Sequence, residues 1–292
     1  MDKVKLAKLL LKINYSLTAI VLILLLFSYI SRSDVSNLER SPIKTKISNE
    51  IRVLELDTGI APHKKLQNYV QYDNSNDYED TNGHGTHIAG IIIYGNQILN
   101  NKGEAVFNPV CRNVKIFSCK YYNSNSFGRD NLSRTIQCFK RALSEKMDIV
   151  NFSGGGPTYS EEEYVAVKNF IDSGGVLVAS AGNERNRLED IPYYPASYGM
   201  THVGRLELRS GKKKTVIALE NIFIVMNIYK NGERALSSNY SDYKKIKKEV
   251  GEGIFSTLLY ERYGKNGGTS QAAAAYTNRM LIKKCNEMNN KE

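Results

Sequence analysis

Ser270, near the end of the chain, has the setting of a nucleophile. It stands between the glycine pair Gly267-Gly268 and an alanine run, Ala272 to Ala275, that favours a helix. A serine on the first turn of a helix has an exposed hydroxyl, and the helix dipole favours negative charge there. The alternative is a helix N-cap, which serine and threonine commonly form. Chemistry therefore depends on partners elsewhere in the chain.

Two upstream residues supply what a serine hydroxyl lacks. Because the hydroxyl is a poor nucleophile near neutral pH, it needs a base to take its proton and a carboxylate to orient that base. The base is His84, whose imidazole titrates near neutral pH and whose flanking glycines allow close backbone approach. The carboxylate is Asp57, which ends an apolar run, 51–56, that predicts a buried strand. Together these residue types predict nucleophilic catalysis.

The segments around these residues resemble the catalytic blocks of the subtilisin-like serine proteases, the subtilases of peptidase family S8. The matching segments are 57–59, 84–90 and 268–270, and they follow the family's order of Asp, His and Ser. Two further segments agree: 151–155 resembles the family's substrate-binding strand, and 179–184 resembles the segment that carries its oxyanion-hole asparagine. The resemblance implies a subtilisin-like fold and a serine endopeptidase that acts through an acyl-enzyme intermediate.

The resemblance also implies a role for each matched residue. Catalysis falls to Asp57, His84 and Ser270, and Asn183 donates to the oxyanion hole together with the backbone N–H of the serine. The implied substrate-binding residues are Ser153, Gly154, Gly155, Ala181 and Gly182. Since glycines leave a strand edge bare, a peptide substrate can add to it as a further strand. The alternative is that these glycines only turn the chain before Pro157.

Apolar strands and helices alternate along the chain and predict the fold class. Strands are expected at 51–56, 114–118, 148–152 and 176–179. Helices are expected around His84, over 132–143 and from Ser160 to Ile171, where Ser160 and Glu163 form a capping-box pattern. This alternation predicts an α/β fold with three layers: a doubly wound, mostly parallel sheet with helices on both faces. The segment 201–235 is expected to form strands with an added hairpin.

The N-terminal residues 1–31 have the layout of a signal peptide or a signal anchor. Several lysines precede an almost uncharged stretch from Ile13 to Ser31. Because no good Ala-x-Ala cleavage site follows, retention as a membrane anchor is favoured, and cleavage would give a secreted protein. Residues 32–45 are expected to form a linker. Residues 46–292 are expected to form the peptidase domain, outside the cytoplasm.

Metal and cofactor chemistry has little support in the sequence. His84 and His87 are close enough to share one side of a helix, but the zincin pattern needs a glutamate between two histidines, and none is present. His87 is therefore interpreted as structural, as the resemblance also implies. No cofactor is predicted, and calcium is implied by the family resemblance only.

Composition is compatible with one large enzyme domain, since the chain has 292 residues and 41% of them are hydrophobic. The net charge of +10 is interpreted as solvated surface, with attraction to anionic membranes as the alternative. No G-x-G-x-x-G phosphate pattern is present, so nucleotide binding is disfavoured and no nucleic-acid partner is predicted. The four cysteines allow pairing without requiring it, and Cys119, on a predicted buried strand, is expected to be an inert thiol.

The predicted partner is a polypeptide substrate, and two questions stay open. A catalytically inactive binding protein on the same fold is the alternative to an active enzyme. Broad degradation is the alternative to the processing of one partner. In the family, the loop 184–192 borders the pocket for the residue before the cleaved bond, and its carboxylates here, Glu184, Glu189 and Asp190, suggest a preference for basic residues.

Overall fold

A computed structural model of the chain describes residues 50–72, 79–96, 98–99, 105–122, 128–205 and 213–290. These residues belong to one compact unit, 49–292. The predicted signal or anchor segment, 1–31, and the predicted linker, 32–45, lie outside the described residues. Among the residues that are described, no helix is both long enough and apolar enough to cross a bilayer.

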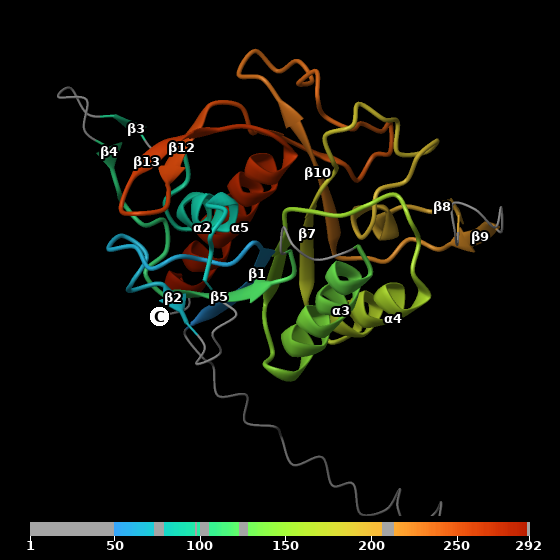
Figure 1. Cartoon of the computed structure of the whole chain (residues 1–292), viewed down its shortest axis with the longest axis horizontal. Helices are drawn as coiled ribbons and strands as arrows, with labels where there is room; N and C mark the ends of the chain where they lie inside the picture. Colours follow the sequence, from blue (N-terminus) through green and yellow to red (C-terminus); the bar gives the residue numbers. More distant parts are fainter. Residues whose placement is uncertain are drawn as a thin grey trace, which may run out of the picture. The chain divides into compact units, whose positions relative to one another are not determined.

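A seven-stranded parallel sheet forms the centre of this unit (Figure 1). Its strand order is β11-β10-β7-β6-β1-β5-β2, and each neighbouring pair runs parallel. The strands are β1 (Ile51–Asp57), β2 (Val70–Gln71), β5 (Val114–Lys120), β6 (Ile149–Phe152), β7 (Val176–Ser180), β10 (Ile222–Ile228) and β11 (Lys247–Val250). The strands predicted over 51–56, 114–118, 148–152 and 176–179 are confirmed.

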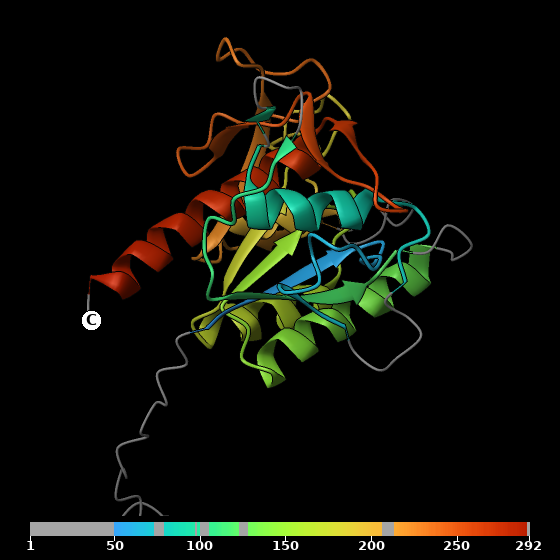
Figure 2. The same cartoon turned by 90° about the vertical axis from the view of Figure 1, so that its left-hand side faces the viewer.

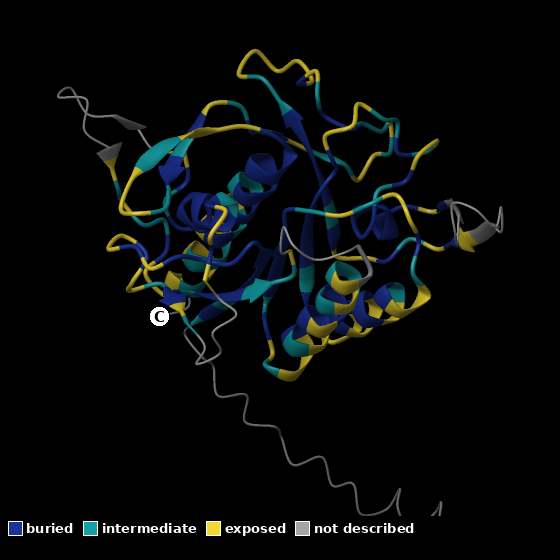
Figure 3. Cartoon of the chain, viewed as in Figure 1, coloured by how far each residue is buried: buried dark blue, intermediate teal, exposed yellow. Residues whose placement is uncertain are grey.

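Helices cover both faces of the sheet. On one face lie α2 (His84–Tyr94) and α5 (Thr269–Asn289), and on the other lie α3 (Gly128–Ser144) and α4 (Glu161–Asp172), as Figure 2 shows. Figure 3 shows that α2 is buried along most of its length, whereas α3 and α4 expose one side. The difference follows from the sequences, because α2 is apolar or small at nearly every position while α3 carries charged residues at helical spacing. The predicted three-layer α/β fold is confirmed.

The remaining elements in the described part of the chain are short. They are the antiparallel pairs β3 (Ile98–Leu99) with β4 (Ala105–Val106), β8 (His202–Arg205) with β9 (Lys213–Val216), and β12 (Ile254–Thr257) with β13 (Tyr263–Asn266), and the 3-10 turn η1 (Ala196–Gly199). The pairing of β8 with β9 confirms the hairpin expected within 201–235.

The winding of the chain reverses beside β1. The chain leaves β1 through α2 and reaches β5 on one side, and it then crosses through α3 to β6 on the other side. In doubly wound sheets, ligand sites form where the strand order reverses, outside the carboxyl ends of the strands. Asp57 ends β1, while Ser153 directly follows β6 and Ala181 directly follows β7. The topology therefore gathers these predicted site residues at one end of the sheet.

Side chains of β1 alternate between the two hydrophobic cores. Leu54 and Leu56 belong to the core between the sheet and helices α3 and α4, whereas Val53 belongs to the core under α2 and α5. Because side chains two residues apart on a strand share a face, Asp57 points to the same side as Val53. The alternation thus directs the Asp57 carboxylate towards α2.

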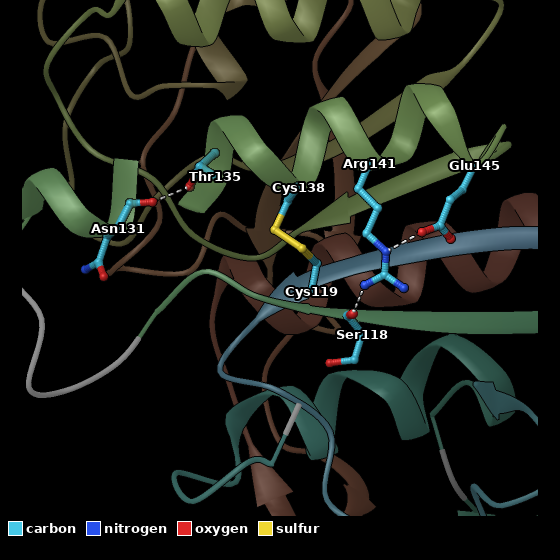
Figure 4. Close-up of a disulfide and its surroundings, with 7 residues drawn as sticks. All are labelled: Ser118, Cys119, Asn131, Thr135, Cys138, Arg141 and Glu145. Carbon is cyan, nitrogen blue, oxygen red and sulfur yellow. Dashed lines mark hydrogen bonds and ion pairs between the residues drawn. A yellow bond between two sulfur atoms is a disulfide. The ribbon is translucent and has the colours of Figure 1, made fainter. Parts of the chain in front are cut away.

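The four cysteines form two disulfides, Cys111–Cys285 and Cys119–Cys138. The expectation of an inert thiol at Cys119 is therefore wrong. Cys119 lies on the side of β5 that α3 covers, and the two Cα atoms of its disulfide are 5.9 Å apart, within the usual range. Figure 4 shows this bond joining β5 to α3, near Arg141, which donates to the backbone of β5. The spacing of cysteines in the sequence does not reveal which of them meet.

The capping box predicted at the start of α4 forms only in part. The Ser160 hydroxyl oxygen accepts the backbone N–H of Glu163 at 3.2 Å, as predicted. The Glu163 carboxyl group instead accepts the phenol O–H of Tyr198 at 2.8 Å. Tyr198 is a fully buried residue of η1, so its hydroxyl needs a partner and competes for the carboxyl group. Glu163 is thereby drawn away from helix capping.

Candidate active site

Asp57 and His84 form a hydrogen-bonded pair. His84 is the first residue of α2, and its Nδ1 lies 2.6 Å from Oδ1 of the buried Asp57. The same oxygen accepts the Thr58 backbone N–H at 2.8 Å. Because an ionised carboxylate only accepts, His84 Nδ1 carries the proton that is shared with Asp57. In the neutral imidazole Nε2 is then the proton acceptor.

The charge of Asp57 governs the protonation of His84. Burial by itself lowers the pKa of His84, but the charge and hydrogen bond of Asp57, with a smaller contribution from the charge of Asp80, outweigh burial and raise that pKa above its usual value. The neutral imidazole, which is the form that accepts a proton, therefore predominates only above this raised pKa.

Asp80, shortly before α2, links the end of β1 to the start of α2, and it was not among the residues predicted from the sequence. Its side chain is buried and accepts five hydrogen bonds. The donors are the hydroxyl of Thr58, the backbone N–H groups of Asn82, Gly83 and Thr86, and the hydroxyl of Thr86. Since these donors stand on both sides of His84 in the chain, they set the position of its imidazole. The available signal was an acidic residue shortly before a helix start.

Ser270 lies on the first turn of α5. Its hydroxyl donates to the backbone carbonyl of Ser153 at 3.0 Å. Within the described residues, no hydrogen bond joins Ser270 to His84. The structure thus brings Asp57 to His84 and, separately, Ser270 to Ser153. The backbone N–H of Ser270 has no helical acceptor because it belongs to the first turn.

Asn183 presents an amide N–H group beside the first turn of α5. Its Oδ1 accepts the backbone N–H and the hydroxyl of Thr269 at 3.0 and 3.1 Å. Because a backbone N–H is always a donor, the amide oxygen must face Thr269 and Nδ2 must point elsewhere. Asn183 is exposed, and its Nδ2 makes no hydrogen bond to any residue described in the structure. This Nδ2 and the N–H of Ser270, the residue after Thr269, are donors of the kind that stabilise an oxyanion.

In the glycine segment after β6, Gly154 and Gly155 have close neighbours where a side chain would begin, whereas Gly156 has open space. A Cβ atom on Gly154 would lie 1.7 Å from the Tyr121 hydroxyl oxygen, and one on Gly155 would lie 2.2 Å from the Tyr194 carbonyl oxygen. Gly156 pairs with Tyr194 through two backbone hydrogen bonds, of 2.7 and 3.0 Å. The backbone N–H and C=O groups of Gly154 and Gly155 make no hydrogen bond to another described residue, so they are available to a peptide strand.

The predicted substrate-binding residues Ala181 and Gly182 are held by Asn239. The Ala181 carbonyl accepts Asn239 Nδ2 at 2.8 Å, and the Gly182 carbonyl accepts the Asn239 backbone N–H at 2.9 Å. These bonds fix the segment that leads to Asn183. They also occupy both carbonyls, which therefore do not accept from a substrate. That Ala181 and Gly182 bind substrate, as part of the wall of the site, stays a prediction.

Two of the three carboxylates of the loop 184–192, those of Glu184 and Glu189, have partners within the protein. Glu184 accepts Asn239 Nδ2 at 2.7 Å. Glu189 accepts the Ser241 hydroxyl at 2.5 Å and pairs with Arg187 at 3.5 Å. Because Arg187 offsets part of the loop's negative charge, the predicted preference for basic residues beside the cleaved bond gains no support from these contacts and stays a prediction.

Two further histidines stabilise the surroundings of the site. His87 is buried with Nε2 3.3 Å from the Gly264 carbonyl, and burial lowers the pKa of His87 to about 4, so that it is neutral at ordinary pH. His202, for which the sequence offered no role, has Nδ1 2.8 Å from the Met200 carbonyl. Nδ1 must therefore donate, which leaves Nε2 to accept the Tyr194 hydroxyl at 2.7 Å.

Among the residues described, no group of three or more His, Cys, Asp and Glu side chains could hold a metal ion. No residues are assigned to calcium, which stays a prediction from the family resemblance.

A family model described as the subtilase family, Peptidase S8, matches residues 38–282. The chain belongs to the subtilase family. The major intracellular serine protease of Bacillus subtilis (strain 168) is 30% identical over 241 residues, and the thermostable alkaline protease of Halalkalibacterium halodurans is 29% identical over 229 residues. These alignments cover 76% and 77% of this chain but 65% and 54% of the relatives. The minor extracellular protease Epr of Bacillus subtilis (strain 168) is 28% identical, over 76% of this chain and 30% of its own length.

This subtilase chain thus spans less than two thirds of each of these relatives. The relatives include an extracellular and an intracellular enzyme, so family membership does not assign a compartment. Solved structures with the same fold include the prenylagaramide maturation protease PagA and the self-cleaved protease domain of PatA, each with a TM-score of 0.62. Their sequences are 18% and 19% identical to this chain. The matches cover 83% of this chain, 78% of the PagA chain and 82% of the PatA chain.

Proposed function

We propose that this subtilase is a serine endopeptidase that hydrolyses peptide bonds through Asp57, His84 and Ser270. The observation that carries the proposal is the 2.6 Å contact between His84 Nδ1 and the buried Asp57 carboxylate. Such a contact selects the tautomer in which Nε2 takes a proton, as the Ser-His-Asp mechanism requires. The protease activities named for the relatives support the same reaction.

In the first half of the reaction, Ser270 forms an ester with the substrate. Its hydroxyl exchanges the hydrogen bond to the Ser153 carbonyl for one to His84 Nε2. The imidazole then takes the proton as the oxygen attacks the carbonyl carbon of the cleaved bond. The tetrahedral intermediate collapses when His84 gives the proton to the departing amine, which leaves an acyl-enzyme.

In the second half, water releases the acyl group. His84 removes a proton from the water, the hydroxide attacks the ester, and Ser270 recovers its proton as the acid leaves. Asp57 stays ionised throughout and stabilises the imidazolium. Because only neutral His84 takes a proton, turnover rises as the pH rises through its raised pKa.

The proposed oxyanion hole consists of Asn183 Nδ2 and the Ser270 backbone N–H. Both donors lie beside the first turn of α5, where the helix dipole also favours negative charge. The substrate is a polypeptide that pairs with the free backbone groups of Gly154 and Gly155, next to Ser153. This pairing holds the cleaved bond with little demand on side chains.

We also propose that the peptidase domain works outside the cytoplasm, anchored by the segment 1–31 or released after its cleavage. Support comes from the two disulfides, which persist in oxidising compartments, and from the lysine-flanked apolar segment. N-terminal sequencing of the mature protein distinguishes the two forms. A start after about Ser31 means cleavage, and an intact N-terminus in the membrane fraction means anchoring.

A catalytically inactive peptide-binding protein is the second candidate. The observation in its favour is that the Ser270 hydroxyl bonds to the Ser153 carbonyl and not to His84. Such a protein would bind peptides along Gly154 and Gly155 without cleaving them.

Active-site labelling tests the proposal. The full chain and a Ser270→Ala variant are each treated with a fluorophosphonate probe and incubated with casein. If the chain is an endopeptidase, the probe labels Ser270 and the chain releases new amino termini from casein. The Ser270→Ala variant is then neither labelled nor able to cleave casein. Labelling without casein cleavage indicates a peptidase restricted to one partner. A folded, unlabelled chain that still binds peptides indicates the binding protein.

A further inference from the structure

A cavity of about 660 Å³ opens beside the glycine segment. Its lining includes Ser153, Gly154 and Gly155, to which the proposed function assigns the substrate backbone. Successive side chains of an extended peptide point to opposite sides, so a peptide paired with this segment directs a side chain into the cavity. The volume lies within the usual range of ligand pockets, about 300–1,000 Å³.

The cavity wall is largely aromatic and apolar. Tyr121 follows β5, Leu132 lies on α3, Phe152 ends β6 and Tyr194 precedes η1. Among the described lining residues, Glu163 is the one with a formal charge. An aromatic wall accommodates the aliphatic stem of a lysine or arginine, and a carboxylate at its side attracts the cationic end.

The Glu163 carboxyl group is only half satisfied by the protein. The residue is 5% exposed, and one oxygen accepts the Tyr198 hydroxyl at 2.8 Å. The other oxygen accepts no hydrogen bond from any residue in the described ranges. The nearby Tyr194 hydroxyl is already committed to His202. A donor that enters the cavity would complete the hydrogen bonding of a buried group, which is worth more than the same contact in water.

The ionisable groups around Glu163 leave its charge uncompensated. Burial raises the pKa of Glu163 to about 7, and the Tyr198 hydrogen bond opposes this rise. The phenols that face it are those of Tyr198 and Tyr194 on the segment around η1 and that of Tyr121 after β5. Burial raises the pKa of each phenol, so they remain neutral. On its own helix, Glu161 and Glu162 add only further negative charge.

We propose that Glu163 is a specificity-determining residue, whose carboxylate favours substrates that place a lysine or arginine side chain in this cavity. The proposal rests on the proposed function for the placement of the peptide. A cation in the cavity pairs with the ionised carboxylate and displaces no existing partner. At acid pH the carboxyl group is neutral. The cavity should then bind a cationic side chain and an uncharged side chain of similar length with similar affinity.

Peptide binding to the Ser270→Ala variant tests this inference without any need for turnover. The probes are short fluorescent peptides with lysine at one position in turn, matched by peptides with norleucine, which has a similar length and no charge. At about pH 8 we expect lysine to bind about tenfold tighter than norleucine at one position, the size of one charge-assisted hydrogen bond. At about pH 5.5 the ratio should approach one, since Glu163 has its pKa at about 7.

Two variants control the result. Glu163→Gln, in the same background, keeps the size and the acceptor for Tyr198 but should lose the lysine preference at every pH. Glu162→Gln removes one charge from the same turn at an exposed residue outside the cavity lining and should keep the preference. Absence of any position with a lysine preference, or a preference that Glu163→Gln retains, overturns the inference. Failure of the proposed function appears separately, as a folded, unmodified chain that is not labelled by the fluorophosphonate probe and does not cleave casein.

Discussion

The starts of helices α2 and α4 each carry a buried carboxyl group, and the two groups have very different surroundings. Asp80 is 3% exposed and Glu163 is 5% exposed, so burial alone does not distinguish them. Asp80 accepts five hydrogen bonds, whereas Glu163 accepts one through its side chain. The number of donors therefore decides whether a buried carboxyl group is a fixed anchor or remains responsive to a ligand.

The comparison assigns different tasks to the two regions. Around α2, Asp80 and Asp57 hold His84 for proton transfer, so changes there should alter turnover. Around α4, Glu163 borders the cavity, so changes there should alter the choice of substrate. In both regions the helix start favours an anion, but only the α2 region supplies enough donors to satisfy it.

Glu55 extends the comparison to a group without donors. It is 1% exposed on β1, and neither carboxyl oxygen has a hydrogen-bond partner within the described residues. Burial first, and then the charges of Asp57 and Asp80, raise the pKa of Glu55 well above its usual value. This rise favours the neutral form of Glu55, which adds no charge to the pair formed by Asp57 and His84.

The largest expected effect separates turnover from substrate choice. Asp57→Asn lets the amide select the wrong His84 tautomer, so kcat should fall about 10⁴-fold, as in other Ser-His-Asp enzymes. The ratio of lysine to norleucine binding should stay unchanged. Steady-state kinetics and the peptide-binding assay measure the two quantities. A variant that keeps kcat but changes the ratio would reverse the proposed division of tasks.

Asp80→Asn should mainly reduce stability. An asparagine keeps one acceptor oxygen and turns an amide N–H group towards donors, so at least two charge-assisted hydrogen bonds of about 2 kcal/mol each are lost. The free energy of unfolding should fall by about 4 kcal/mol in urea titrations. Glu79→Gln, at the exposed neighbouring residue, is the control and should change it little. Equal effects of the two variants would show that the donors around Asp80 do not stabilise the fold.

Asn183→Ala tests the oxyanion hole. We expect kcat to fall about 10²–10³-fold with little change in KM, which is the loss known for the corresponding asparagine of subtilisin, a member of this family. The donor acts on charge that develops only in the transition state, so substrate binding should be spared. A raised KM with unchanged kcat would instead identify Asn183 as a group that binds the ground state.

Glu163→Gln should change how stability depends on pH. The pKa of Glu163 is raised from 4.5 to about 7, so the folded chain binds this proton more tightly than the unfolded chain. The stability this provides is fully present below about pH 4.5 and is lost as the pH rises through about 7. Between about pH 4.5 and about pH 7, the free energy of unfolding of the variant should therefore rise by about 2 to 3 kcal/mol relative to that of the unmodified chain. Urea titrations at a series of pH values measure this difference. Parallel pH profiles for the two proteins would contradict the raised pKa.

The fold could be predicted from the sequence because it depends on local patterns, and the members of the proposed site were inferred from local motifs. Alternating apolar strands and helices predict the parallel sheet, and the order of that sheet brings the end of β1 close to the ends of β6 and β7. The alanine run after Ser270 predicted a helix, and α5 contains it, whereas the glycines after Ser153 lie beyond the end of β6 and not within a strand. Such features are set by residues close together in the chain.

What the sequence missed depends on contacts between distant residues. Cys119 meets Cys138 because α3 packs on β5, and Tyr198 takes the carboxyl group of Glu163 because η1 packs on α4. For Asp80, the Thr58 hydroxyl becomes a donor only when β1 and α2 meet, whereas its other donors lie within six residues of it in the chain. The partners of Cys119 and Glu163 do not follow from composition or local spacing, since each depends on how two elements pack together.

The most direct test of the central claim is the distance between Ser270 Oγ and His84 Nε2 in a crystal structure of the chain trapped with a peptidyl phosphonate. We predict phosphorus bonded to Ser270 Oγ, and His84 Nε2 within hydrogen-bond reach of that oxygen, at about 2.6–3.2 Å. We further predict a phosphonyl oxygen that accepts from Asn183 Nδ2. A phosphonate on another residue, or an imidazole that remains out of reach of Ser270 in the adduct, would contradict the account.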